Sequence, residues 1–182
     1  IDEAIELGVK QFSFTGGEPF LIKDIVKILD YALQRAPCLV LTNGVGALPK
    51  RLPQLLPLRA RPNSLSFRIS IDWPDADRHD AGRGIGNFAI SWDTARRLHE
   101  AGFKVSIARQ MTLGEDRAAV DSAYASLCVA NRLPGDTRIV FFPDFGVPDQ
   151  SRDVPFVTES CMTTYQTEAT RRDFMCAYSK ML

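Results

Sequence analysis

Strand-like and helix-like segments alternate along residues 1–146, and this alternation limits the folds that the chain can adopt. Short apolar or aromatic runs predict strands at 10–14, 38–44, 64–72, 104–111 and 138–146. The segments between these runs carry apolar residues at helical spacing, as at 22–33 and 120–128. Strands separated by helical segments are typical of an α/β protein with a parallel sheet and right-handed crossovers.

The facing of side chains on the predicted strands favours a barrel-like sheet over a flat one. The run 64–72 has an apolar and a polar face, namely Leu65, Phe67, Ile69 and Ile71 against Ser66, Arg68, Ser70 and Asp72. Ser13 and Thr15, like Ser106 and Gln110, repeat the polar face on neighbouring strands. Because a polar face cannot lie under a helix, we expect an open or partial barrel with helices outside and a wet, ligand-binding lumen.

Three further predictions concern the connections and the end of the chain. The proline-rich stretch 48–62 can hold only a short or broken helix, and 73–90 is predicted to be a long loop. Ser91 can cap a helix over 92–102. No periodic order is visible from residue 147 on, so we expect a barrel domain at 1–146 and an irregular segment at 147–182.

Composition argues against several classes of function. Lys+Arg and Asp+Glu each number 22, so the net charge is zero and no basic field favours nucleic acid or anionic lipid. No apolar stretch approaches the roughly 20 residues of a membrane span, and the first residues lack signal-peptide order. The four cysteines are too few and too scattered for a disulfide scaffold, which fits a reducing compartment. We therefore expect a cytoplasmic protein that binds neither nucleic acid nor a membrane.

The stretch TGGEP, residues 15–19, follows the first predicted strand at the end where parallel α/β folds bind ligands. Gly16 and Gly17 allow the backbone to approach a ligand closely and leave its polar groups available. Glu18 offers an acceptor for an ammonium group, and Pro19 fixes the chain as it turns. An ordinary tight turn between strand and helix accounts for the same residues equally well.

TGGEP occurs together with LTNG at 41–44, SID at 70–72 and HDAGRGIGNF at 79–88. In this order these motifs resemble those of the radical S-adenosylmethionine (radical SAM) enzymes over about residues 1–146. The resemblance implies a partial (β/α)6 TIM-like barrel, S-adenosylmethionine as cofactor and a 4Fe-4S cluster. It also implies an enzyme that forms a 5'-deoxyadenosyl radical to abstract hydrogen from a substrate. Peptide modification and enzyme maturation are among the reactions of the family, and flavodoxin or ferredoxin is the kind of electron donor implied.

The resemblance also assigns roles to residues in these motifs. It implies that Gly16, Gly17 and Glu18 hold the amino group of S-adenosylmethionine, while Ser70 and Asp72 contact its ribose or carboxylate. These assignments leave the reacting side chains themselves unidentified.

The remaining residues of the motifs carry alternatives. Thr42 and Asn43 are candidates for a cofactor contact, although an Asn-Gly turn is an equally good interpretation. Arg109 is the candidate for the cofactor carboxylate, but strand parity puts it on the outward face, so the contact requires a bulge or strand end at Ala108. For His79, Asp80 and Arg83 we expect hydrogen bonds that fasten a long loop rather than catalysis.

The cysteines do not match the radical SAM pattern. The family's Cys-x3-Cys-x2-Cys motif is absent, so we expect a fragment whose first strand and cluster ligands lie upstream of Ile1. The alternative is a cluster-less degenerate barrel that acts as a cofactor-binding scaffold or regulator. A phosphate site in an ordinary α/β barrel is a third interpretation, which Glu18 disfavours because a carboxylate repels phosphate.

The four cysteines that are present divide into two pairs. Cys161 and Cys176 could bind an auxiliary cluster in a cysteine-rich, SPASM-like extension, or could be ordinary thiols. Cys38 and Cys128 are expected in the core. Arg68, on the polar face, could meet an anionic group of the substrate or pair with Asp72.

Overall fold

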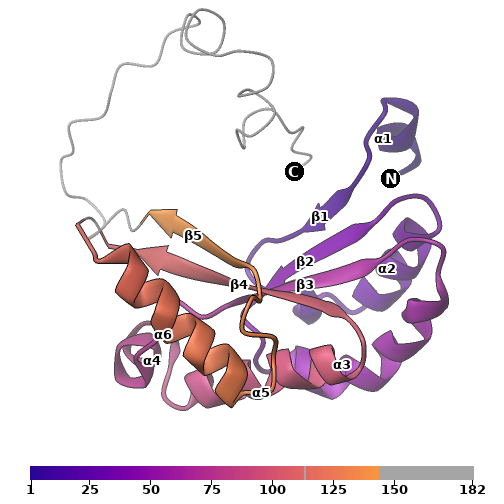
Figure 1. The fold of residues 1–182 in the computed structure, drawn as a ribbon. Helices are drawn as coiled ribbons and strands as arrows, with labels where there is room; N and C mark the ends of the chain where they lie inside the picture. Colours follow the sequence, from indigo (N-terminus) through magenta and orange to yellow (C-terminus); the bar gives the residue numbers. More distant parts are fainter. Residues whose placement is uncertain (113, 144–182) are drawn as a thin grey trace, which may run out of the picture. The chain divides into compact units, whose positions relative to one another are not determined.

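A five-stranded parallel sheet organises the computed structural model, which describes residues 1–112 and 114–143. The strands lie in the order β1-β2-β3-β4-β5, so each strand pairs with the next one in the sequence (Figure 1). The elements are α1 (Asp2–Glu6), β1 (Phe12–Phe14), η1 (Pro19–Leu21), α2 (Ile25–Leu33), β2 (Cys38–Thr42), α3 (Ala47–Leu55), η2 (Leu56–Ala60), β3 (Leu65–Ser70), α4 (Ala76–Arg83), α5 (Asn87–Glu100), β4 (Lys104–Met111), α6 (Arg117–Ala130) and β5 (Ile139–Pro143). This sequential parallel order confirms the predicted α/β fold.

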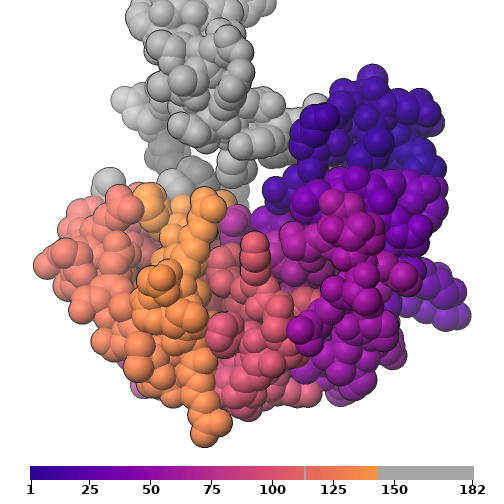
Figure 2. All heavy atoms as spheres, turned by 45° about the vertical axis from the view of Figure 1, so that its right-hand side comes forward, coloured from indigo at the N-terminus to yellow at the C-terminus, as the bar shows by residue number. Residues whose placement is uncertain are grey.

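Helices α2 to α6 lie on one side of the sheet (Figure 1). In the space-filling view, the N-terminal segment (indigo) and the segment from α6 to β5 (salmon to orange) lie on opposite sides of the described residues, as expected for the two ends of the strand order (Figure 2). Burial along β3 alternates strictly: Phe67 and Ile69 are fully buried, whereas Arg68 and Ser70 are partly exposed. The helices therefore cover the apolar face, and the polar face is the lumen side of a partial TIM-like barrel, as predicted.

The prediction of a long loop over 73–90 is wrong, because α4 occupies Ala76–Arg83 and α5 begins at Asn87. Helix α4 has hardly any apolar periodicity, so it depends on polar contacts. The Asp75 carboxylate caps it by accepting from the Arg78 amide at 2.8 Å. Ser91 is correspondingly not a helix cap: it is buried within α5, and its hydroxyl donates to the Asn43 carbonyl at 2.8 Å.

The proline-rich stretch forms the short helix α3 followed by the 3-10 turn η2, in agreement with the prediction of a short or broken helix. Pro53 lies inside α3 and has no N–H to offer the carbonyl of Pro49 one turn earlier. The Arg97 guanidinium from α5 approaches that carbonyl at 3.4 Å. A side chain from the next helix thus compensates for the hydrogen bond that the proline removes.

Two predictions about the end of the chain fall partly outside the described residues. The strand expected at 138–146 appears as Ile139–Pro143. The expected boundary between 146 and 147, and the irregular segment 147–182, lie outside the described residues and stay predictions. Within residues 1–112 and 114–143, none of the helices is long and apolar enough to cross a membrane.

Candidate functional site

The TGGEP turn is joined to the end of β2 by the carboxylate of Glu18. This carboxylate accepts from the amide of Phe20 at 3.1 Å, which caps η1, and from the amide of Asn43 at 3.0 Å. The Thr42 hydroxyl lies 2.8 and 2.9 Å from its two oxygens. Three donors from two segments that lie 24 residues apart in the sequence therefore converge on one side chain. Glu18 fixes the turn against the neighbouring strand.

Gly16 and Gly17 present an open stretch of backbone beside this carboxylate. Gly16 has φ +130°, which disfavours any side chain, and a Cβ on either glycine would meet no atom within 4 Å. Both residues are exposed, and among the described residues their amides and carbonyls form no hydrogen bonds. Unpaired carbonyls next to a carboxylate form a suitable acceptor set for an ammonium group.

Thr42 and Asn43 use their side chains within the protein. The buried Thr42 hydroxyl accepts from the Gly44 amide at 3.2 Å besides donating to Glu18. The Asn43 side-chain oxygen accepts from the Val45 amide at 2.9 Å, which closes an Asx turn with the positive-φ Gly44 as its middle residue. For Asn43 the turn-forming interpretation therefore describes what the structure shows.

Ser70 is the last residue of β3, and Asp72 follows it at the same edge of the sheet. Ser70 is partly exposed on the lumen face, and its hydroxyl forms no hydrogen bond within the described residues. The Asp72 carboxylate instead makes a bidentate ion pair with Arg83, with Nε to Oδ2 at 2.5 Å and Nη2 to Oδ1 at 2.8 Å. Only 11% of the Asp72 side chain is exposed. Arg83 thus sets the orientation of a carboxylate that the sequence suggested as a ligand contact.

Helix α4 also contacts the backbone of Asp72. The Asp72 amide donates to Nδ1 of the buried His79 at 3.1 Å. Burial lowers the pKa of His79, and nearby Asp72 and Asp80 only partly offset this effect. Nδ1 must carry a lone pair to accept the amide, so the geometry and the lowered pKa both favour a neutral imidazole.

Asp80 and the other polar residues of this segment have the fastening role that we expected. The Asp80 carboxylate accepts from the amides of Gly86 at 2.6 Å and Phe88 at 2.8 Å, and so ties α4 to the start of α5. His79 and Arg83 both contact Asp72. The contact between Arg83 and Asp72, eleven residues apart, was not predicted.

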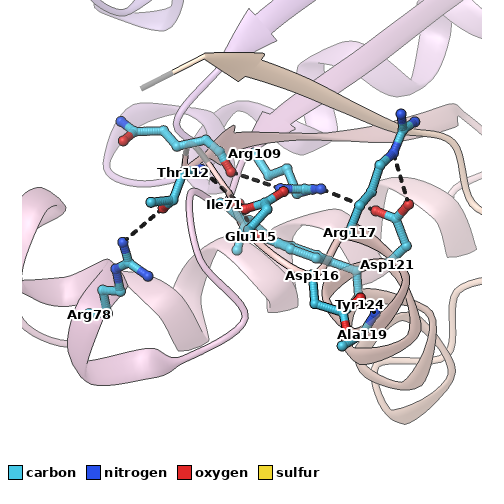
Figure 3. Close-up of polar contacts among 11 residues, drawn as sticks. Ile71, Arg78, Arg109, Thr112, Glu115, Asp116, Arg117, Ala119, Asp121 and Tyr124 are labelled. Atoms are coloured by element: carbon cyan, nitrogen blue, oxygen red, sulfur yellow. Dashed lines mark hydrogen bonds and ion pairs between the residues drawn. The ribbon is translucent and has the colours of Figure 1, made fainter. Parts of the chain in front are cut away.

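Arg109 does not reach the lumen, which corrects the expected cofactor contact. Strand β4 pairs with β3 over 104–108 and with β5 over 107–111, so it runs through Ala108 with neither the bulge nor the strand end that this contact required. Arg109 instead points between the sheet and α6, where its side chain is fully buried (Figure 3). Its guanidinium pairs with Glu115 at 2.6 Å and with Asp121 at 3.3 Å. Parity alone would have placed Arg109 correctly.

Cys38 and Cys128 are core residues, as predicted. Both thiols are buried on the helix side, and burial raises the pKa of Cys38 to about 12 and raises that of Cys128 as well. Within residues 1–112 and 114–143, no group of three or more His, Cys, Asp or Glu residues is arranged to hold a metal ion. The described residues therefore do not fit a 4Fe-4S cluster. Cys161 and Cys176 lie outside them.

Comparison with known proteins defines the class to which this fold and site belong. The family model for the radical SAM superfamily matches residues 1–124, and the chain belongs to this superfamily. Among curated relatives, an AdoMet-dependent heme synthase from Nitratidesulfovibrio vulgaris is 32% identical over 114 residues, which cover 62% of this chain and 30% of that protein. The mycofactocin maturase MftC from Mycobacterium ulcerans is 31% identical over 140 residues, covering 73% and 37%. A PqqA peptide cyclase from Granulibacter bethesdensis is 32% identical over 108 residues, covering 59% and 28%.

A solved structure supports the same fold. The crystal structure of SuiB from Streptococcus suis, bound to S-adenosylmethionine, superposes with a TM-score of 0.59 at 15% sequence identity. The match covers 84% of this chain and 33% of the SuiB chain. The matched part of the chain spans 30% and 37% of the length of the first two curated relatives.

Proposed function

We propose that this chain forms the S-adenosylmethionine-binding part of a radical SAM enzyme that modifies a peptide. The observation that carries the proposal is the clustering of the unpaired Gly16-Gly17 backbone, the Glu18 carboxylate and Ser70 at the carboxyl edge of the parallel sheet. Ligands of parallel α/β folds bind at this edge.

The chemistry of these groups matches the polar groups of S-adenosylmethionine. The carbonyls of Gly16 and Gly17 accept hydrogen bonds from its ammonium group, and Glu18 supplies negative charge beside them. Glu18 has three donors already but four acceptor positions, so it can both hold the turn and face a cation. Ser70 and Asp72 are available to its ribose hydroxyls or carboxylate, with Asp72 kept in one orientation by Arg83.

These roles separate what the protein contributes from what the cofactor contributes. S-adenosylmethionine supplies radical hydrogen abstraction in this superfamily, while the protein binds it, orients it and excludes water. In this proposal the described residues bind and orient the cofactor. Because they lack a ligand set for a 4Fe-4S cluster, they are assigned no part in holding one. A peptide substrate is supported by the names of two relatives, a mycofactocin maturase and a PqqA peptide cyclase.

The proposal is tested by placing a side chain on the open backbone. In the full-length protein, Gly17→Val adds a branched side chain where a Cβ meets no protein atom, so folding is expected to survive. We expect it to weaken S-adenosylmethionine binding at least about tenfold in a calorimetric titration, because the side chain occupies the space of the ligand. Gly82→Ala, on an equally open glycine in α4, is the matched control and should leave affinity unchanged.

Two results would count against the proposal. Equal affinity in Gly17→Val and wild type would refute the proposed contact between the cofactor and the glycine backbone. Absence of binding by the wild-type protein would refute S-adenosylmethionine as the cofactor. The catalytic part is read separately, as formation of 5'-deoxyadenosine by the anaerobically reconstituted full-length protein with a chemical reductant.

A further inference from the structure

A row of polar side chains crosses the lumen face of the sheet, two residues before Ser70 on β3. Arg68 on β3 pairs in register with Ser106 on β4. On the other side of β4, next to Ser106, lies Arg138, the residue just before β5; its carbonyl accepts from the Ile107 amide at 3.0 Å. Ile139 lies opposite Ile107 on the buried face, so Arg138, one residue earlier, belongs to the lumen face. Two arginines therefore flank one serine on three adjacent strands.

Ser106 holds the Arg68 side chain in the row. Its hydroxyl donates to the Phe67 carbonyl at 3.3 Å and lies 3.4 Å from Nε of Arg68. The two terminal nitrogens of Arg68 have no hydrogen-bond partner within the described residues. The two terminal nitrogens of Arg68 are therefore available to pair with a carboxylate.

Asp72, the acid that the sequence suggested as a partner of Arg68, is paired with another residue. Asp72, four residues further along the chain on the same face, is bound on both oxygens by Arg83. None of the ion pairs within residues 1–112 and 114–143 includes Arg68 or Arg138. The row thus contrasts with buried Arg109, which has two acidic partners.

We propose that Arg68 and Arg138 form a subsite for a carboxylate group of the substrate. This inference rests on the proposed function, because it assigns a substrate class to the same lumen. Partial burial lowers the pKa of Arg68, and the positive charge of Arg138 lowers it further. Two like charges on neighbouring strands repel each other, and a carboxylate between them relieves that repulsion.

The distance from the cofactor edge fits a substrate anchor. Arg68 and Ser70 are two residues apart on one strand, which corresponds to about 6.6 Å along the sheet. Arg68 and Arg138 lie two strands apart, or about 10 Å between backbones, a gap that two arginine side chains can bridge around one carboxylate. A substrate held by its carboxylate in this row has the rest of its chain within reach of a ligand at Ser70. Peptides carry such groups on acidic side chains and at their C-termini.

The test uses the full-length protein and two probes, N-acetylglutamate α-methylamide and its uncharged glutamine counterpart. In calorimetric titrations with and without S-adenosylmethionine, we expect wild type to prefer the charged probe. Arg68→Gln and Arg138→Gln should each weaken its binding about tenfold, the loss of one charge-assisted contact. Arg138 is exposed, so Arg138→Gln should fold and can test the subsite even if Arg68→Gln folds poorly. The control Arg132→Gln removes an exposed arginine of the loop after α6 and should change nothing.

The outcomes separate this proposal from the one on which it rests. Equal binding of the charged and uncharged probes overturns the carboxylate subsite, and so does tighter binding of inorganic phosphate than of the charged probe. Loss of S-adenosylmethionine affinity in Arg68→Gln also overturns it, because the arginines would then serve the cofactor. If wild type fails to bind S-adenosylmethionine, the proposed function fails, while the titration without cofactor still reads the subsite.

Discussion

Removing the charge of Glu18 should loosen the TGGEP turn even when no ligand is present. In Glu18→Gln the side chain keeps its shape, but one carboxylate oxygen becomes an NH2 group that faces donors. The amides of Phe20 and Asn43 and the hydroxyl of Thr42 then share a single acceptor. One partly buried donor at least is left without a partner.

The magnitude follows from counting these bonds. A hydrogen bond to a charged group contributes about 1.5–3 kcal/mol against about 0.5–1.5 kcal/mol for a neutral one, and an unsatisfied buried donor costs about 1–3 kcal/mol. We expect Glu18→Gln to lower the free energy of unfolding by about 2–3 kcal/mol. For a chain of this size that corresponds to a fall in Tm of roughly 4–12 °C. Thr42→Val should cost about 1–3 kcal/mol, since it also strands the Gly44 amide.

The assay is a double-mutant cycle measured by urea denaturation without ligand. Because Glu18 and Thr42 share a hydrogen bond, the double variant should lose about 1 kcal/mol less than the two single losses added together. Glu6→Gln is the matched control, an exposed glutamate of α1 with no partner among the described residues, and should be neutral. Additive losses within about 0.5 kcal/mol would refute the claim that Glu18 acts through the end of β2.

Three further changes test the facing of the strands and the buried ionisable groups. Ser70→Ala should impair S-adenosylmethionine binding with little change in stability. Ile71→Ala, at a fully buried position, should lower the free energy of unfolding by about 2–5 kcal/mol and leave affinity intact. Equal losses of stability in both variants would contradict the assignment of Ser70 to the lumen face and Ile71 to the buried face. Arg109→Met should destabilise the fold by roughly 3–5 kcal/mol, because the largely buried Glu115 loses its cation and keeps only the Thr112 amide as a partner. S-adenosylmethionine affinity in the folded fraction should not change, and a selective loss of affinity would restore the cofactor contact. The lowered pKa of His79 means that the unfolded chain binds the proton more readily than the folded one. The free energy of unfolding should therefore be highest above about pH 6.5 and fall below that pH by up to about 1.4 kcal/mol per pH unit. Unfolding titrations between pH 7.5 and 5.5 measure this slope. His79→Gln should flatten that slope, and an unchanged slope would assign it to another group.

Strand facing could be predicted from the sequence because it depends on a period of two residues that a single strand displays. The alternation in Leu65–Ser70 specified the buried face, the lumen face and the barrel-like sheet before any contact was known. The same rule placed Arg109 on the helix side, and the structure agrees with the rule rather than with the role that the family resemblance suggested. Local periodicity was thus the more reliable guide at this position.

Contacts between distant segments were beyond such a rule. Glu18 and Thr42 are 24 residues apart, and nothing local to either residue indicates that their side chains meet. Helix α4 was missed for a related reason: its stability comes from the Asp75 cap and from two contacts with Asp72 rather than from an apolar stripe. A search for capping residues, rather than for apolar spacing, would have found its first turn.

The same residue type plays opposite parts on the two faces of the sheet, and the reason is electrostatic. On the helix side a guanidinium has lost its water, so Arg109 is retained only together with Glu115 and Asp121. On the lumen side Arg68 keeps partial access to solvent and can stay without an internal carboxylate, which leaves its charge for a ligand. An arginine on a barrel strand is therefore a candidate for binding when its parity points inward and the neighbouring acids are already paired. Arg68 meets both conditions and Arg109 meets neither, so the functional charge on these strands should be sought at Arg68.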